Sequence, residues 1–204
     1  MAAEAYRTVE EPAEAAFSVN GSRFICLVAP AASESAVRER VETVAAAHPD
    51  ATHVVSAYRL LGHPVVEGAD DAGEPGGSAG KPALEVLRGE ELLDVVAVVV
   101  RYYGGTNLGF GGLVRAYARA VSEAIAAASV VERVPTRGYV VEVAYDDSGR
   151  VRSVLESSGV DFDAEYTDRV TFAVTVEVEQ APELLERLRS ATSGRAAIAR
   201  RDVA

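Results

Sequence analysis

The sequence predicts an α+β protein built from two modules, and two observations carry that prediction. In the second half of the 204-residue chain, strand and helix patterns follow one another in the order β-α-β-β-α-β, which usually folds as a ferredoxin-like sandwich. In the first half, a strongly apolar strand runs into a glycine-rich turn and then into a long helix. The rhythm of the pattern changes at Pro135, so we expect domains at residues 1–135 and 138–204.

Strands and helices of the first half are indicated by β-branched runs and by helical spacing of apolar residues. The expected strands are 22–28, 52–60 and 92–103. The expected helices are one that Ser33 caps and that ends at His48, one at 81–88, and one at 113–128. Residues 62–80, rich in Gly, Pro and Asp, are expected to form a long loop.

The second half repeats the alternation on shorter elements. We expect a strand at 139–145, a helix that Asp147 or Ser148 caps and that ends at Gly159, and a hairpin of 160–166 with 169–179. A helix from Pro182 to Gly194 and a strand at 196–200 complete the unit. RNA-recognition modules share this topology, but the outward face of strand 169–179 carries acids and lacks stacking aromatic residues, which argues against that function.

Composition limits the classes of protein that the chain can belong to. The net charge of −11 argues against wholesale nucleic-acid binding, because phosphate contacts need Lys and Arg. A single cysteine, Cys26, excludes an internal disulfide and a thiolate metal cluster, which favours a cytoplasmic location. The first residues lack a signal-peptide pattern, and no apolar run approaches the roughly 20 residues that span a bilayer, so we expect no membrane association.

One segment stands apart from this acidic background. Residues 95–122 contain Arg101, Arg115 and Arg119 and no Asp or Glu. A glycine turn followed by a helix start presents unpaired backbone N–H groups, which can hold an anion; close packing alone also explains such glycines, and both readings stay open. Arg115 is expected to reach back toward the turn, whereas a carboxylate such as Glu74 can hold Arg101 inward. The P-loop and dinucleotide fingerprints both fail, because Pro75 and Val114 stand where each needs a glycine.

Two motifs are specific enough to indicate a family. The stretch 100–117 reads VRYYGGTNLGFGGLVRAY, and the stretch 73–82 reads GEPGGSAGKP. Together they resemble the signatures of the YigZ/IMPACT family over the first domain, and the second domain is similar in topology only. The candidate binding residues on these motifs are Glu74, Lys81, Arg101, Tyr102, Tyr103, Gly104, Gly105, Asn107, Gly111, Gly112, Arg115 and Arg119.

The resemblance implies a first domain like the second domain of ribosomal protein S5, and a ferredoxin-like second domain. That pair resembles the C-terminal domains of elongation factor G. It also implies a non-enzymatic regulatory or binding protein of translation, whose partners are the ribosome, RNA or a translation-associated protein. Ala72 and Asn107 depart from the family pattern, and Asn107 thins the basic patch.

Catalytic residues are not indicated. His48, His53 and His63 lie beside prolines or in strand and loop positions that favour surface or cap roles over metal binding, and Cys26 lies in an apolar strand as an inert thiol. We therefore expect no metal and no cofactor. The alternative is a small-molecule phosphotransferase-like enzyme that uses the glycine loop as a phosphate site, with Asp71 or Glu74 as the ligand for Mg²⁺.

Overall fold

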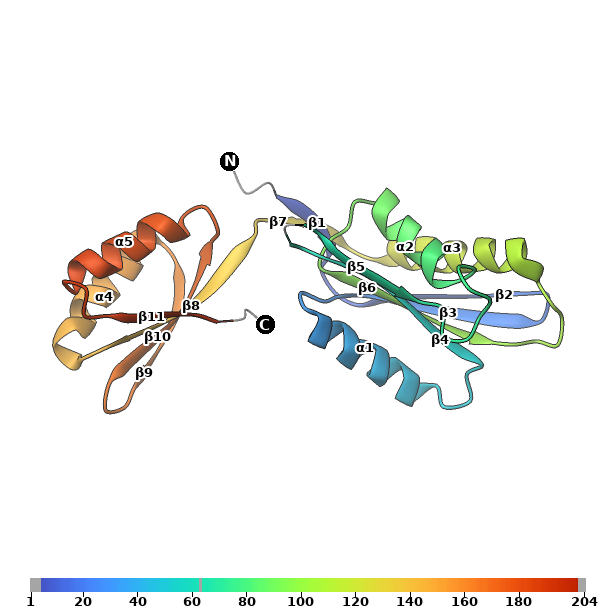
Figure 1. The fold of residues 1–204 in the computed structure, drawn as a ribbon, viewed down its shortest axis with the longest axis horizontal. Helices are drawn as coiled ribbons and strands as arrows, with labels where there is room; N and C mark the ends of the chain where they lie inside the picture. Colours follow the sequence, from blue (N-terminus) through green and yellow to red (C-terminus); the bar gives the residue numbers. More distant parts are fainter. Residues whose placement is uncertain (1–4, 63, 202–204) are drawn as a thin grey trace. The chain divides into compact units, whose positions relative to one another are not determined.

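The computed structural model describes residues 5–62 and 64–201, so His63 lies outside the described residues. The chain forms two compact units (Figure 1), a larger one at Tyr6–Arg133 and a smaller one that contains the described residues from Val134 onward. Both mix helices and strands, which confirms the α+β class. Among the described residues, no helix is long and apolar enough to cross a membrane.

The larger unit is built on a five-stranded antiparallel sheet with helices on both faces. In sheet order the strands are β2 (Ala13–Val19), β3 (Ser22–Pro30), β6 (Val95–Tyr102), β4 (His53–Leu60) and β5 (Val66–Asp70). Helix α1 (Glu34–Ala47) covers one face, and α2 (Gly80–Gly89) and α3 (Gly109–Ala127) cover the other (Figure 1). Strands β1 (Tyr6–Val9) and β7 (Val130–Arg133) pair separately.

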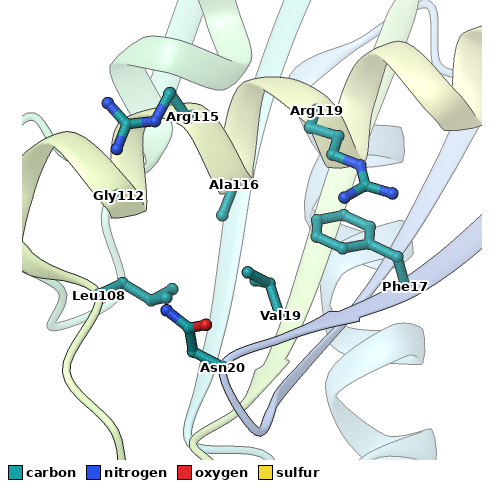
Figure 2. Close-up of a pocket in the computed structure, with 8 residues that line it drawn as sticks. All are labelled: Phe17, Val19, Asn20, Leu108, Gly112, Arg115, Ala116 and Arg119. Carbon is teal, nitrogen blue, oxygen red and sulfur yellow. The ribbon is translucent and has the colours of Figure 1, made fainter.

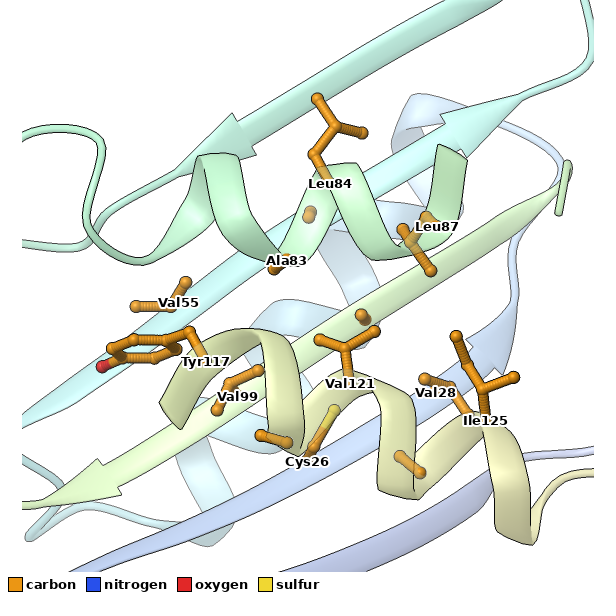
Figure 3. Close-up of a cluster of buried hydrophobic side chains, with 14 of the residues drawn as sticks. Cys26, Val28, Val55, Ala83, Leu84, Leu87, Val99, Tyr117, Val121 and Ile125 are labelled. Carbon is orange, nitrogen blue, oxygen red and sulfur yellow. The ribbon is translucent and has the colours of Figure 1, made fainter. Parts of the chain in front are cut away.

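The centre of this sheet is the apolar strand β6, which is buried on both faces. Val96, Val98 and Val100 pack toward α1, while Val95 and Val99 belong to the core beneath α2 and α3. Such a strand reads as a continuous hydrophobic run, as the sequence predicts. Cys26 on the neighbouring strand is fully buried in the same core (Figure 3). Burial raises the pKa of its thiol, which disfavours the reactive thiolate form.

The structure corrects the sequence-based prediction at several elements of the larger unit. Strands β1, β2 and β7 were not expected, and β5 lies inside the segment expected to be a loop. Strand β2 is rich in Ala and Glu, which have low β propensity, and it is recruited by pairing with β3. Helix α3 begins at Gly109, four residues before the expected start, and Val114 and Ala118 lie at the margin of its buried face.

The smaller unit has the predicted β-α-β-β-α-β order. Its elements are β8 (Thr136–Val143), α4 (Tyr145–Ser158), β9 (Asp161–Tyr166), β10 (Val170–Glu177), α5 (Ala181–Ala191) and β11 (Ala197–Arg201). The antiparallel sheet has the order β11-β8-β10-β9, and both helices pack on its apolar face. The predicted cap is wrong: Asp147 lies inside α4, where its carboxylate accepts two hydrogen bonds from Arg195 that lower its pKa.

Candidate anion-binding site

The glycine turn between β6 and α3 owes its shape to a close approach of two backbone segments. Gly104 lies against Gly21, and a Cβ at Gly104 would come within 1.9 Å of the Gly21 carbonyl carbon. The Gly104 N–H also donates to the Ser22 hydroxyl at 3.2 Å. Gly105 has a φ of +80°, a conformation that favours glycine. These two glycines therefore shape the turn, which brings the β2–β3 hairpin beside the start of α3.

The start of α3 is open to a ligand. Leu108 stands at the N-cap position and makes no side-chain capping bond. Within the described residues, the first-turn N–H groups therefore lack the side-chain acceptor that a capping residue usually provides. Phe110 is 58% exposed and Gly111 is exposed as well. Gly111 and Gly112, which precede the helix expected at 113–128, lie within the first turn that Gly109 begins.

Arg115 lies next to this first turn. A Cβ added at Gly111 would lie 3.5 Å from Nη1 of Arg115, so the guanidinium points back along the helix toward its start, as predicted. Arg115 is exposed, and within the described residues its side chain forms no hydrogen bond and no ion pair. One turn further, Arg119 is already engaged: its Nε donates to Glu123 at 2.7 Å, and its guanidinium lies 4.1 Å from the centre of the Phe17 ring.

A hollow of about 210 Å³ lies between these arginines and the β2–β3 hairpin. We call it the α3 hollow. Its hairpin wall consists of Phe17, Val19 and Asn20. Its other wall consists of Leu108, Gly112, Arg115, Ala116 and Arg119 (Figure 2). Two cationic side chains, Arg115 and Arg119, therefore lie on the helix side of a hollow whose lining is largely apolar.

Arg101 does not belong to this exposed surface. It is 5% exposed, and its Nη1 donates to the Glu74 carboxylate at 2.6 Å. Tyr117 donates to the same Glu74 oxygen at 2.7 Å, and burial together with this bond raises the pKa of Tyr117. Nη2 of Arg101 also lies 3.4 Å from the Ser22 hydroxyl. The inward pairing of Arg101 with Glu74 is confirmed, and the pair holds the GEPGG segment against β6.

The GEPGGSAGKP segment is organised around a second carboxylate. The N–H groups of Gly77, Ala79 and Gly80 donate to Asp71 at 2.6 to 3.0 Å. Burial acts to raise the pKa of Asp71, but these bonds outweigh it and hold the pKa below its usual range. Lys81, at the start of α2, is exposed and does not line the α3 hollow.

The two tyrosines of the motif point to opposite faces of the sheet, as alternation requires. Tyr102 lies on the α1 side, where its hydroxyl is 2.9 Å from Nδ1 of His48, the C-cap residue of α1. Tyr103 is 45% exposed and donates to the Asn107 side chain at 3.1 Å. Asn107 thus orders the turn through Tyr103.

Histidines and carboxylates do not assemble a metal site in the described part of the chain. Nδ1 of His53 lies 2.8 Å from the Ala72 carbonyl oxygen, and its Nε2 lies 3.9 Å from the Glu74 carboxylate. The sequence-based search missed Phe17, Val19 and Asn20. Asn20-Gly21 is a strong hairpin signal, which would have indicated the β2–β3 hairpin but not its place beside the turn.

Comparison with known proteins identifies the two units. The Impact N-terminal domain model matches residues 20–125, and a domain of unknown function (DUF1949) matches residues 141–195. The chain is 37% identical to IMPACT family member YvyE of Bacillus subtilis, covering 95% of this chain and 89% of the relative. It is 34% identical to IMPACT family member YigZ of Escherichia coli, and the match covers 86% of this chain and 88% of the relative.

A solved structure described as a hypothetical protein matches with a TM-score of 0.72 and 29% identity, over 98% of both chains. The agreement therefore extends over both units in sequence and in fold. This chain belongs to the IMPACT family.

Proposed function

We propose that the chain is a non-enzymatic binding protein of the translation apparatus, and that its larger unit holds RNA phosphate groups at the start of α3. The observation that carries the proposal is Arg115, whose guanidinium pairs with no group in the described part of the chain and lies beside a helix start without a side-chain cap. Helix starts and arginines are the groups that bind phosphate in proteins. The link to translation rests on the family resemblance.

The surrounding charge supports the choice of this surface. The chain carries a net charge of −11, which repels phosphate over most of its surface. Residues 95–122, by contrast, contain no acidic residue. On α3 itself the one acidic residue is Glu123, which pairs with Arg119 and leaves Arg115 as the arginine more available to phosphate. With Arg115 free and Arg119 partly engaged, we expect one or two phosphate contacts, hence weak and salt-sensitive binding.

The phosphotransferase alternative has no specific observation in its favour. Its two candidate Mg²⁺ ligands already accept bonds inside the protein, Asp71 from three backbone N–H groups and Glu74 from Arg101 and Tyr117. Glu74 is also only 8% exposed, which limits the access of a metal ion to its carboxylate.

Co-sedimentation of the full chain with bacterial ribosomes at low salt tests the proposal. Arg115→Ala removes the unpaired cation, and Arg38→Ala is the matched control, because Arg38 is an exposed arginine on α1 at the opposite face of the sheet. We expect the wild type and Arg38→Ala to pellet equally and Arg115→Ala to pellet several-fold less. A wild type that stays in the supernatant, or equal losses in both variants, contradicts the proposal.

A further inference from the structure

The α3 hollow has features that phosphate binding alone does not require. Its lining includes the apolar side chains of Phe17, Val19 and Leu108, which together we call its floor, next to Arg115 and Arg119 (Figure 2). A phosphate needs donors and cations, not an apolar floor. The ligand that suits the whole hollow therefore carries an apolar surface next to its negative charge.

The volume of the α3 hollow further limits which ligands it can hold. Pockets for drug-sized molecules measure roughly 300–1,000 Å³, whereas the hollow measures about 210 Å³. It has room for one ring system or one side chain. A duplex cannot place a base there, because its bases are stacked and paired, but a single strand can turn one base outward.

Polar groups at the rim favour a base over an acidic peptide side chain. Asn20 lines the hollow, and within the described residues its side-chain amide forms no hydrogen bond. An amide offers both a donor and an acceptor, which match the edge of a nucleobase. Phe17 is held firmly, stacked on Phe24 with ring centroids 5.3 Å apart, and Arg119 lies over it. Guanidinium planes of this kind also stack on bases.

We propose that the α3 hollow binds one unpaired nucleotide of single-stranded RNA. The base packs on Val19 and Leu108 beside the Arg119 guanidinium, Asn20 bonds to its edge, and the adjoining phosphate meets Arg115 and the start of α3. This inference rests on the proposed function and adds to it a preference for unpaired RNA. Binding of duplex RNA uses phosphate contacts alone, so it does not depend on the base contacts proposed here.

The test measures binding of the full chain to a short single-stranded RNA, to the same sequence as a duplex, and to the same strand with abasic positions. Ala116 points from α3 into the hollow, so Ala116→Leu fills it without changing charge (Figure 2). Stacking of a base on an aromatic side chain contributes roughly 1–3 kcal/mol. The hollow offers aliphatic side chains and a guanidinium instead, so we expect the lower half of that range, which corresponds to about five- to thirtyfold in affinity. We expect the wild type to prefer the single strand over the abasic strand by that factor.

Ala116→Leu should abolish this preference and leave duplex binding unchanged, whereas Arg115→Ala should weaken both. Asn20→Gly, which tolerates the left-handed φ of +47° at this position, should reduce the preference without loss of fold. Circular dichroism and thermal melting confirm that each variant is folded. Equal binding to intact and abasic strands overturns this inference alone. Failure to bind any RNA, or binding of an acidic peptide in place of RNA, overturns the proposed function as well.

Discussion

The buried pair of Glu74 and Arg101 allows a stability prediction that separates its role from that of the exposed arginines. Both side chains are nearly inaccessible, with 3% and 6% of their surface exposed. Glu74→Ala leaves the guanidinium buried without its counter-charge and removes the acceptor of Tyr117. Breaking a buried pair in this way costs about 3–5 kcal/mol. For a unit the size of Tyr6–Arg133, that corresponds to a fall in Tm of roughly 10–20 °C.

Differential scanning calorimetry measures this loss, and Glu123→Ala is the control because it removes an exposed carboxylate that also pairs with an arginine. Exposed pairs contribute about 0–1 kcal/mol. The double variant Glu74→Leu/Arg101→Met should recover much of the loss, since apolar replacement of a buried pair is often tolerated. A Glu74→Ala loss as small as that of Glu123→Ala would refute the reasoning.

Three further results are expected. Gly104→Ala forces a Cβ against Gly21 and should lower the urea-unfolding free energy by about 1–3 kcal/mol, whereas Gly89→Ala, which meets nothing within 4 Å, should not lower it. Asp71 has a lowered pKa, so the stability that it contributes is complete above its unfolded pKa of about 3.8 and is lost as the pH falls through its folded pKa. In urea titrations at acidic pH, Asp71→Asn should therefore reduce the dependence of the unfolding free energy on pH. Because Asp71 and Glu74 already accept internal bonds, ATP with Mg²⁺ should leave the Tm unchanged, and a shift of several degrees would revive the phosphotransferase alternative.

Sequence reasoning predicted the elements whose pattern is local. Three features could be predicted because each depends only on neighbouring residues. They are the apolar run of β6, the glycine turn, and the left-handed glycine that ends α4, Gly159. Strand β2 is different: its Ala and Glu residues carry a weak strand signal, and only pairing with β3 makes it a strand.

The same limit applies to the candidate site. The reach of Arg115 and the inward turn of Arg101 follow from spacing and from a nearby carboxylate, and both were predicted. The α3 hollow was not predicted, because three of its eight lining residues come from a hairpin about 90 residues earlier in the chain. Long-range pairing of this kind leaves no periodic trace around the motif.

The salt dependence of duplex RNA binding tests the central claim most directly. Each phosphate contact contributes about 0.9 to the slope of log K against log salt, by analogy with duplex DNA. We predict that Arg115→Ala lowers the affinity and reduces the slope by about 0.9, while Arg38→Ala, which removes the same charge from the α1 face, leaves the slope unchanged. Identical slopes for the wild type and Arg115→Ala would contradict the account.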